Sequence, residues 1–446
     1  MKTDMTNGPI LKNLILFTIP LVLGNLLQLT YNSMDSIIVG QFVGKEALAA
    51  VGTSNPLMTL VLLFTNGICL GASILTSFYY GSKQISTLKK QVSTGMISGA
   101  VFTLFVSLII VIFAKPFLQL LQVDSSILSI SMSYLRIIML SMIFSYVYNY
   151  FSNILRALGD SKSPLYFLAI TSILNIFGDL FFVVVLKTGV NGAAFSTAFC
   201  EFLSALLCWI YISKKVELLK LGTDWFLFDF TLFKKTISYG IVSAMQQSSI
   251  QIGKLVTQGM VNSLGIDPMA AFNATNRFDD FAILPEQNIS HGMTSMMAQN
   301  VGAGKTKRAI HTFYCGTLVN IFYGFLMGLI LYLCSNPIMH LFTNDLSVIQ
   351  EGQKYLKIMA FIYFIPGITN ALQGYFRGIG DLKITLWSTI VNMSSRCISC
   401  YILIFLCHFD FSAIAWSYLI GWICMILFEL PFIFFGKKNY FQTNKL

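Results

Sequence analysis

The amino-acid sequence contains about twelve apolar runs of about 20 residues or more, the length that an α-helix needs to cross a bilayer. One soluble core cannot bury so many runs of this length. Only 11% of the residues are charged, whereas a soluble domain has about 25%. We therefore predict an all-α polytopic membrane protein with twelve transmembrane helices, and prolines inside four of the spans predict kinks. The predicted spans are residues 14–39, 48–79, 93–113, 131–155, 163–186, 190–212, 234–262, 268–298, 310–334, 350–376, 383–406 and 411–435, with Pro20, Pro56, Pro285 and Pro366 inside them.

Lysine and arginine gather in alternate connections between these spans, and this asymmetry predicts the orientation. By the positive-inside rule both termini are cytoplasmic, in the cell inner (cytoplasmic) membrane. The net charge of +10 then belongs to a face against anionic headgroups, and we expect no nucleic-acid partner. The basic face holds Lys83, Lys89, Lys90, Arg156, Lys162, Lys214, Lys215, Lys220, Lys234, Lys235, Lys305, Lys307, Arg308, Arg377 and Lys383 with Lys2, Lys12, Lys437, Lys438 and Lys445 at the termini, whereas the opposite connections hold only Lys45, Lys115 and Lys187.

The two halves of the chain repeat each other. The stretch RALGDSK (156–162) recurs as RGIGDLK (377–383), an offset of 221 residues (377 − 156). Chance similarity between apolar segments does not readily produce the shared R-x-x-G-D-x-K. We predict two six-helix bundles related by a pseudo-two-fold axis along the membrane normal, an architecture typical of secondary transporters. The predicted parts are an N-terminal lobe (1–215), an interfacial linker (216–233) and a C-terminal lobe (234–446).

A carboxylate, Asp35, lies inside the first apolar run, in the stretch YNSMDSIIVG (residues 31–40). Residues three and four apart are neighbours on a helix, so Gln28, Tyr31 and Asn32 form one polar stripe with Asp35. An isolated carboxylate in lipid is costly, and such groups face the protein interior or a wet cavity and mark ion or proton paths. Topology places five polar residues together in the outer half of the N-terminal lobe: Asp35, Tyr134, Asn175, Asp179 and Thr197.

These five residues predict a site that couples transport to a cation. Burial and a second carboxylate both favour the protonated form, so Asp35 and Asp179 could bind and release a proton near physiological pH. Sodium is equally compatible with the oxygens of Asp35, Asn175 and Asp179, and no firm metal site is predicted. The alternative is a polar cluster that only holds helices together. Glu201, four residues after Thr197 and deeper in the membrane, fits either a site role or helix packing.

The C-terminal half carries charges of both signs at similar depth. At the offset of 221 Asn175 and Asp179 correspond to Arg396 and Cys400, and at an offset of 220 Asp35 corresponds to Leu255, next to Lys254. We expect internal pairing of these charges, because a buried charge needs a partner. Contact between Asp279 or Asp280 and a substrate is the functional alternative. The charges in question are Lys254, Arg277 and Arg396 against Asp279, Asp280 and Glu286.

The whole chain resembles the multidrug and toxic compound extrusion (MATE) transporters. The motifs that carry the resemblance are PLVLGNLLQLTYNSMDSIIVGQFVGKEALAAVG, ILRALGDSKSP, NIFGD, GVNGAAFST, AQNVGAGK and LQGYFRGIGDLK. The resemblance implies a secondary antiporter that exports amphipathic, often cationic compounds in exchange for H⁺ or Na⁺ by alternating access. In one branch it also implies a coupling site built from residues that match Asp35, Tyr134, Asn175, Asp179 and Thr197. A C-lobe sodium site described for another branch is not matched, because Pro366 stands about where its carboxylate would fall.

Other functions remain open from the sequence. A lipid-linked glycan or lipid flippase of the same superfamily would have the same number of helices, and Lys254 and Arg396 mildly favour it. An enzyme is not expected: the four histidines form no metal-binding pair on one helix, and there is neither a P-loop nor G-x-S-x-G. We expect a monomer in the bilayer, small amphipathic organic substrates, and no cofactor apart from the coupling ion. The substrate-cavity candidates are Gln28, Tyr31, Asn32, Glu201, Lys254, Asp279, Asp280 and Arg396.

Overall fold

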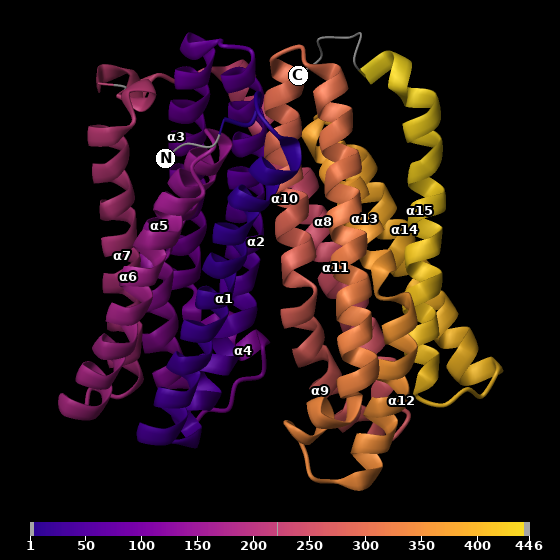
Figure 1. Ribbon diagram of the computed structural model, residues 1–446. Coiled ribbons are helices and arrows are strands. Elements are labelled where there is room, and N and C mark those ends of the chain that lie inside the picture. Colours follow the sequence, from indigo (N-terminus) through magenta and orange to yellow (C-terminus); the bar gives the residue numbers. More distant parts are fainter. Residues whose placement is uncertain (1–3, 221, 441–446) are drawn as a thin grey trace. The chain divides into compact units, whose positions relative to one another are not determined.

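The computed structural model describes residues 4–220 and 222–440, and every regular element within these residues is helical (Figure 1). Nine helices of this described part are long and apolar enough to cross a membrane, and one bent pair of helices adds a tenth candidate span. These observations confirm the predicted all-α polytopic membrane fold. The terminal residues 1–3 and 441–446, which bear on the predicted orientation, lie outside the described residues.

The described chain divides into two compact units. Unit 1 contains Ile19–Ala244, and unit 2 contains Asp4–Thr18 together with the described residues from Met245 onward. In chain order the helices before α8 are α1 (Ile10–Phe42), α2 (Lys45–Gly81), α3 (Ile85–Ile112), α4 (Ala114–Leu120), α5 (Leu128–Ala157), α6 (Lys162–Asp179), η1 (Leu180–Val185), α7 (Val190–Lys215), η2 (Glu217–Leu219) and η3 (Gly222–Phe226). They are followed by α8 (Phe230–Asn262), α9 (Ile266–Ala282), α10 (Leu284–Gly302), α11 (Thr306–His340), α12 (Leu346–Ile362), α13 (Phe364–Gly378), α14 (Leu382–Tyr401), η4 (Ile402–Leu406) and α15 (Ser412–Tyr440).

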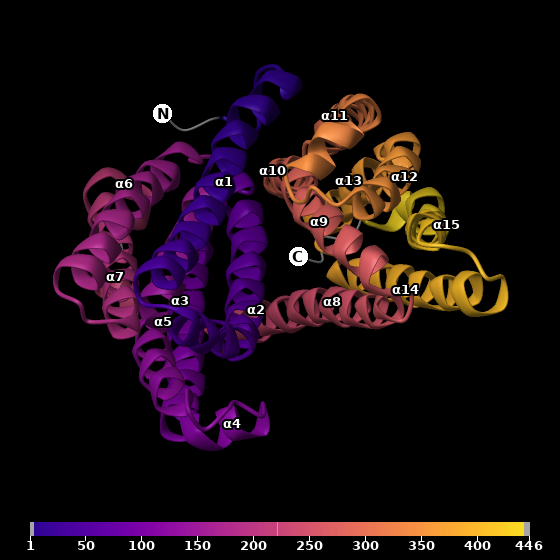
Figure 2. The ribbon, with the colours of Figure 1, turned by 90° about the horizontal axis from the view of Figure 1, so that it is seen from below.

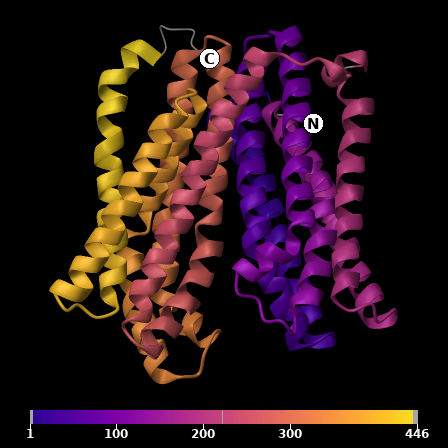
Figure 3. The ribbon, with the colours of Figure 1, turned by 180° about the vertical axis from the view of Figure 1, so that it is seen from behind.

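Each unit is a bundle of packed helices (Figures 2 and 3). In unit 1, α5 is central and packs against α2, α3 and α7, while α6 lies beside α7. In unit 2, α10, α11 and α13 pack on one another, α12 lies beside α11, and α14 pairs with α15. The apolar cores form where these helices meet, and the lipid-facing sides keep large exposed residues such as Phe105 and Phe322.

Two of the predicted spans are helical but more polar than the rest. The segments 234–262 and 268–298 correspond to α8 and to α9 with α10, none of which is among the nine apolar helices of the described chain. The second of them is also broken at Ile283, two residues before Pro285 in the first turn of α10. The predicted span 350–376 is broken too, into α12 and α13, which meet at an angle of 53°. These interruptions bring polar side chains into the interior of unit 2.

The internal repeat is visible in the geometry of the shared motif. Gly159 and Gly380 both follow the end of a helix and adopt positive φ angles, 89° and 84°. At each, the following amide returns to the helix: Asp160 donates to Leu155 O at 2.9 Å and Asp381 donates to Phe376 O at 2.9 Å. This helix ending favours glycine because a Cβ is disfavoured at positive φ. The conserved spacing of R-x-x-G-D-x-K is therefore explained by the same helix cap in both units.

A contact between helices repeats at the same offset. In unit 1 the Ser73 hydroxyl donates to Asn153 O at 3.2 Å, and in unit 2 the Thr294 hydroxyl donates to Gly374 O at 3.4 Å. The two donors and the two acceptors are each 221 residues apart (294 − 73 and 374 − 153). Equivalent helices therefore approach one another in the same way within each unit.

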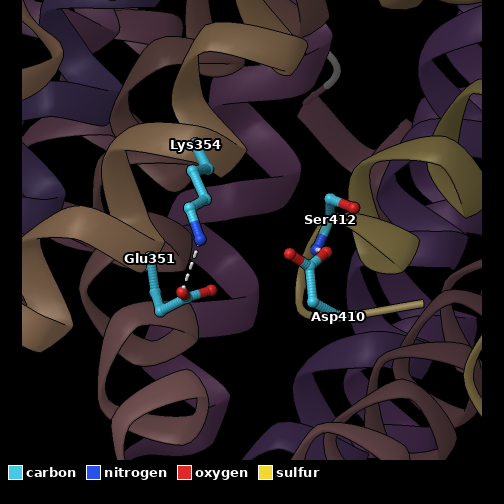
Figure 4. Close-up of polar contacts among 4 residues, drawn as sticks. All are labelled: Glu351, Lys354, Asp410 and Ser412. Carbon is cyan, nitrogen blue, oxygen red and sulfur yellow. Dashed lines mark hydrogen bonds and ion pairs between the residues drawn. The ribbon is translucent and has the colours of Figure 1, made fainter. Parts of the chain in front are cut away.

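The short connection before α15 is ordered by local polar contacts (Figure 4). The Ser412 amide donates to Asp410 Oδ1 at 3.0 Å, so Asp410 caps the start of α15. On α12, Lys354 pairs with Glu351 at 2.9 Å. The Ser412 side-chain hydrogen bond is the largest influence that lowers the pKa of Asp410, which keeps this carboxylate ionised.

Candidate functional site

A buried carboxyl group, that of Asp179, and a half-buried one, that of Asp35, meet in unit 1. Asp179 is the last residue of α6 and has no exposed surface, and Asp35 lies on α1. Their side chains lie within hydrogen-bonding range of each other, and Thr197 of α7 lies within the same range of Asp35. The π-helical turn η1 starts at the residue after Asp179. Such turns are rare and occur frequently at functional sites. The structure thus brings Asp35, Asp179 and Thr197 together from three helices.

The carboxyl groups have few donors around them. The Ser196 hydroxyl, next to Asp179, donates to Asn175 O at 3.1 Å, and it accepts from Asn175 Nδ2 at 3.3 Å. Both Asp179 oxygens, Asp35 Oδ1 and Asn175 Oδ1 are buried without a hydrogen-bond partner among the described residues. Since buried polar atoms normally have partners, these oxygens form an acceptor-rich group that suits a proton or a bound cation.

Tyr134 of α5 is largely buried at the edge of this group. It lies within electrostatic range of Asp35 and Asp179, but no hydrogen bond joins it to either of them in the described structure. The predicted five-residue set therefore separates into a contacting group and a neighbour. Asp35 lies within hydrogen-bonding range of both Asp179 and Thr197, Asn175 is hydrogen-bonded to Ser196, and Tyr134 lies nearby.

A small cavity of about 50 Å³ lies beside the carboxyl pair. Gln28, Tyr31 and Glu201 line it together with Asn175 and Thr197. The Ser145 hydroxyl donates to Glu201 Oε1, while Glu201 Oε2 is buried without a partner. Since one water needs about 10–15 Å³ of such space, the cavity has room for a few waters but not for a drug-sized molecule.

One member of the predicted polar stripe departs from the others. Asn32 is exposed and is not among the residues that line the 50 Å³ cavity. Asn32 follows Gln28 by four residues and precedes Asp35 by three, but it is about 100° from Tyr31, which places it at the edge of the stripe and outside the cavity lining.

Unit 2 contains a much larger cavity, of about 400 Å³. The four candidates from this half, Lys254, Asp279, Asp280 and Arg396, all line it. Lys254 pairs with Asp280 at 3.3 Å, and both side chains are more than half exposed. An exposed pair of this kind contributes only about 0–1 kcal/mol to stability.

Apart from this pair, the predicted pairing of the three basic residues (Lys254, Arg277 and Arg396) with the three acidic ones (Asp279, Asp280 and Glu286) is wrong. Lys254 and Asp280 form the only one of these ion pairs within the described residues. Arg277 is exposed, and Glu286 accepts from Asn370 Nδ2 at 3.4 Å instead of binding a cation. Arg396 is 5% exposed and its guanidinium carbon lies 3.1 Å from the centroid of the Tyr418 ring. An aromatic face attracts a cation but does not replace a carboxylate as a hydrogen-bond acceptor.

The sequence analysis missed a buried polar network in unit 2. Gln246 Nε2 donates to Gln373 Oε1 at 2.7 Å, and Gln373 Nε2 donates to Glu429 Oε1 at 2.7 Å. Arg377 Nη2 donates to Gln246 Oε1 at 3.3 Å, which brings the arginine of the repeated motif into the network. Glu429 has no exposed surface. The available signal was the single carboxylate in the apolar run 411–435.

No group of three or more histidine, cysteine, aspartate or glutamate side chains in the described residues is placed to hold a metal ion. A sodium ion would have to use carboxyl, amide, hydroxyl and backbone oxygens, of the kinds found around Asp35 and Asp179.

Comparison with known proteins identifies the class. The sequence model of the MatE family matches residues 20–181 and again 243–402, one match in each half of the chain. The chain therefore belongs to the MatE family of membrane transporters. It is 28% identical over 397 residues to the probable multidrug resistance protein YpnP of Bacillus subtilis, covering 87% of each chain.

Further similarities extend over nearly the whole chain. It is 21% identical over 438 residues to the multidrug export protein MepA of Staphylococcus haemolyticus, covering 98% of this chain and 96% of MepA. A crystal structure of a MATE protein in the bent conformation superposes with a TM-score of 0.90 at 18% identity, covering 98% of this chain and 96% of the other. At this identity the structural match supports the fold.

Proposed function

We propose that the protein is a secondary antiporter that exports amphipathic, cationic drugs or toxic compounds across the cytoplasmic membrane by alternating access. Each transport cycle exchanges substrate for H⁺ or Na⁺. The family membership supports transport, and the names of YpnP and MepA support drugs as the substrates. The proposed orientation has both termini in the cytoplasm, with the protein working as a monomer in the bilayer.

The observation that carries this proposal is the contact between Asp35 and Asp179. Two ionised carboxylates at this range repel each other, and the surroundings offer neither a basic side chain nor enough donors to offset the repulsion. A proton shared between them, or a sodium ion held by their oxygens with Asn175 Oδ1, removes the repulsion. Binding and release of the cation would therefore change how α1 packs on α6, and Thr197 would hold Asp35 in position.

The cavity residues then divide into two roles. Gln28, Tyr31 and Glu201 would give water and the coupling ion access to the carboxyl pair. The 400 Å³ cavity has a volume that a small organic molecule can occupy. Lys254, Asp279, Asp280 and Arg396 would contact the substrate there.

The alternative is a lipid-linked glycan or lipid flippase. The observation that favours it is the buried guanidinium of Arg396, since a lipid pyrophosphate needs basic ligands. The acidic pair in unit 1 has no role in this alternative, which is why we favour antiport.

Transport in everted membrane vesicles tests the proposal. A fluorescent lipophilic cation is added outside the vesicles, and pH and sodium gradients are imposed separately. We expect one gradient to drive accumulation that stops when that gradient is collapsed. Accumulation that ignores both gradients would contradict antiport, and gradient-independent movement of a fluorescent lipid would support the flippase.

A further inference from the structure

The 400 Å³ cavity of unit 2 contains a buried cation with no ionic partner. Arg396 lines this cavity, is 5% exposed, and forms no ion pair within the described residues. Its Nε and Nη2 atoms are buried without any hydrogen-bond partner. Buried charged groups are normally paired or hydrogen-bonded, so this arrangement lacks an anion.

The two free nitrogens have the geometry of an anion receptor. Nε and Nη2 lie on the same edge of the guanidinium plane, and this edge donates two parallel hydrogen bonds to a carboxylate or phosphate. The plane itself is stacked on Tyr418, which leaves the edge as the binding element. The backbone on both sides is also fixed: a Cβ added at Gly421 of α15 would lie 2.6 Å from Asn392 Oδ1 and 3.1 Å from Arg396 Cβ. Close packing of α14 on α15 therefore holds the guanidinium in place.

The nearby carboxylates do not complete the site. Asp280 is paired with Lys254. Asp279 also lines the cavity, but it does not reach Arg396 within ion-pair distance, and its Oδ1 is buried without a partner. Trp422 and Met425 contribute apolar surface to the same cavity. The cavity lining thus offers a cation (Arg396), an anion (Asp279) and apolar side chains (Trp422 and Met425), and the two charges are not paired with each other.

We propose that this cavity is a binding site for the anionic group, carboxylate or phosphate, of an amphipathic molecule, held by Nε and Nη2 of Arg396. The Asp279 carboxylate is placed to receive a positive group of the same molecule. The natural ligand class is then a zwitterionic amphipath rather than a simple cation. The assignment of this ligand as a transported substrate rests on the proposed export function, but the binding site itself does not.

The test uses two dyes that differ in one group. Rhodamine B carries a free carboxylate and a delocalised cation, whereas its ethyl ester keeps the cation and the ring system without the carboxylate. Binding of each dye to the purified full-length chain is measured by isothermal titration calorimetry. We expect rhodamine B to bind about tenfold more tightly, the ratio that corresponds to 1.4 kcal/mol.

Single-residue variants test whether Arg396 causes the preference for rhodamine B over its ester. Arg396→Gln should reduce the affinity ratio of the two dyes to near one, while Arg396→Lys should retain part of the ratio because it keeps the charge and loses the paired donors. Asp279→Asn should weaken both dyes alike and leave the ratio unchanged. Arg136→Gln, a change at an exposed arginine of unit 1, is the matched control and should alter neither affinity. Thermal unfolding of each variant shows whether it is folded.

A competition experiment tests whether the anionic group bound by Arg396 can be a lipid phosphate as well as a carboxylate. Displacement of rhodamine B by dioctanoyl phosphatidic acid, but not by dioctanoylglycerol, would show that the Arg396 site accepts a lipid phosphate. Failure of phosphatidic acid to compete would restrict the site to the carboxylate of the dye. Both outcomes support an anion site as long as Arg396→Gln removes the dye preference.

Two results would overturn the proposal. One is equal affinity of the wild-type chain for the dye and its ester, and the other is an unchanged preference in folded Arg396→Gln protein. Vesicle transport of the ester is measured separately. If the ester is not exported although the carboxylate preference is present, antiport of cations is wrong and the anion site stands.

Discussion

The two units share a helical framework but differ in the charge of their interiors. Unit 1 holds the carboxyl groups of Asp35 and Asp179 beside a cavity of about 50 Å³, with no ion pair there among the described residues. Unit 2 surrounds a cavity of about 400 Å³ with both signs of charge, including Arg377 and Arg396. At the repeat offset, Arg396 stands where unit 1 has Asn175 (396 − 175 = 221). The two units thus share a fold and its helix caps but differ in a few interior side chains, and in the proposed function these side chains decide what each unit binds.

The largest stability difference should appear when a carboxylate is removed from each unit. Glu429→Ala removes one acceptor of Gln373 and the negative charge that acts on the buried guanidinium of Arg377, and loss of one partner of a buried charged group costs about 3–5 kcal/mol. Asp179→Asn removes a like-charge contact and supplies Asp35 with a donor, so the stability of the protein should hold or rise. Thermal unfolding in detergent measures both. If the two variants are equally destabilised, the acidic pair of unit 1 is structural in the same sense as the network of unit 2.

Replacing the glycine of the shared helix cap should lower the stability of the protein by a similar amount in either unit. Gly159→Ala and Gly380→Ala each place a Cβ at a positive φ angle, which costs roughly 1–2 kcal/mol. The unfolding midpoints of the two single variants are compared, with Gly259→Ala, where an added Cβ meets nothing within 4 Å, as a control for the substitution. A large loss in one unit only would show that the motif is kept for different reasons in the two halves.

The smallest effect concerns the start of α15. At the repeat offset, Asp410 corresponds to Gly189, which precedes α7 without a side-chain cap (410 − 189 = 221). Asp410→Ala should cost about 0.5–2 kcal/mol, nearer the lower limit because the site is exposed, whereas Asp410→Gly should cost only a few tenths. Asp410 is visible beside Ser412 in Figure 4.

The contribution of Asp410 should also depend on pH. The Ser412 side chain, and then its amide, lower the pKa of Asp410 in the folded state. The stabilisation is therefore present above the unfolded pKa of about 3.9 and is lost as the pH falls through the folded pKa. Unfolding midpoints at pH 7 and near pH 3 measure this. A difference between wild type and Asp410→Ala that is independent of pH would contradict the capping interpretation.

Much of the unit 1 site could be predicted from the sequence. Helical periodicity placed Gln28, Tyr31 and Asp35 on one face, and the order of the spans placed Asp179 at the same depth. Both inferences use only chain direction and helix geometry. The π-helical turn after Asp179 could not be predicted, because helical periodicity does not distinguish such a turn from the α-helix before it.

Unit 2 was less predictable for physical reasons. Whether Arg396 meets Asp279 depends on side-chain direction, and in the structure its guanidinium stacks on Tyr418 of the neighbouring helix. The role of Glu429 was hidden because its partners, Gln373 and Arg377, come from a helix far away in the sequence. The break at Ile283 could be anticipated only in part, from Pro285.

The most direct test of the central proposal is drug efflux per folded transporter in Asp35→Asn protein, under an imposed pH or sodium gradient. The variant keeps the volume of the side chain and removes its charge, and Asp124→Asn at an exposed loop of unit 1 is the matched control. We predict near-normal expression with gradient-driven efflux abolished, the same result for Asp179→Asn, and a double variant no worse than either, since groups that act as one unit are not additive. Efflux by Asp35→Asn at near the wild-type rate would contradict the coupling role.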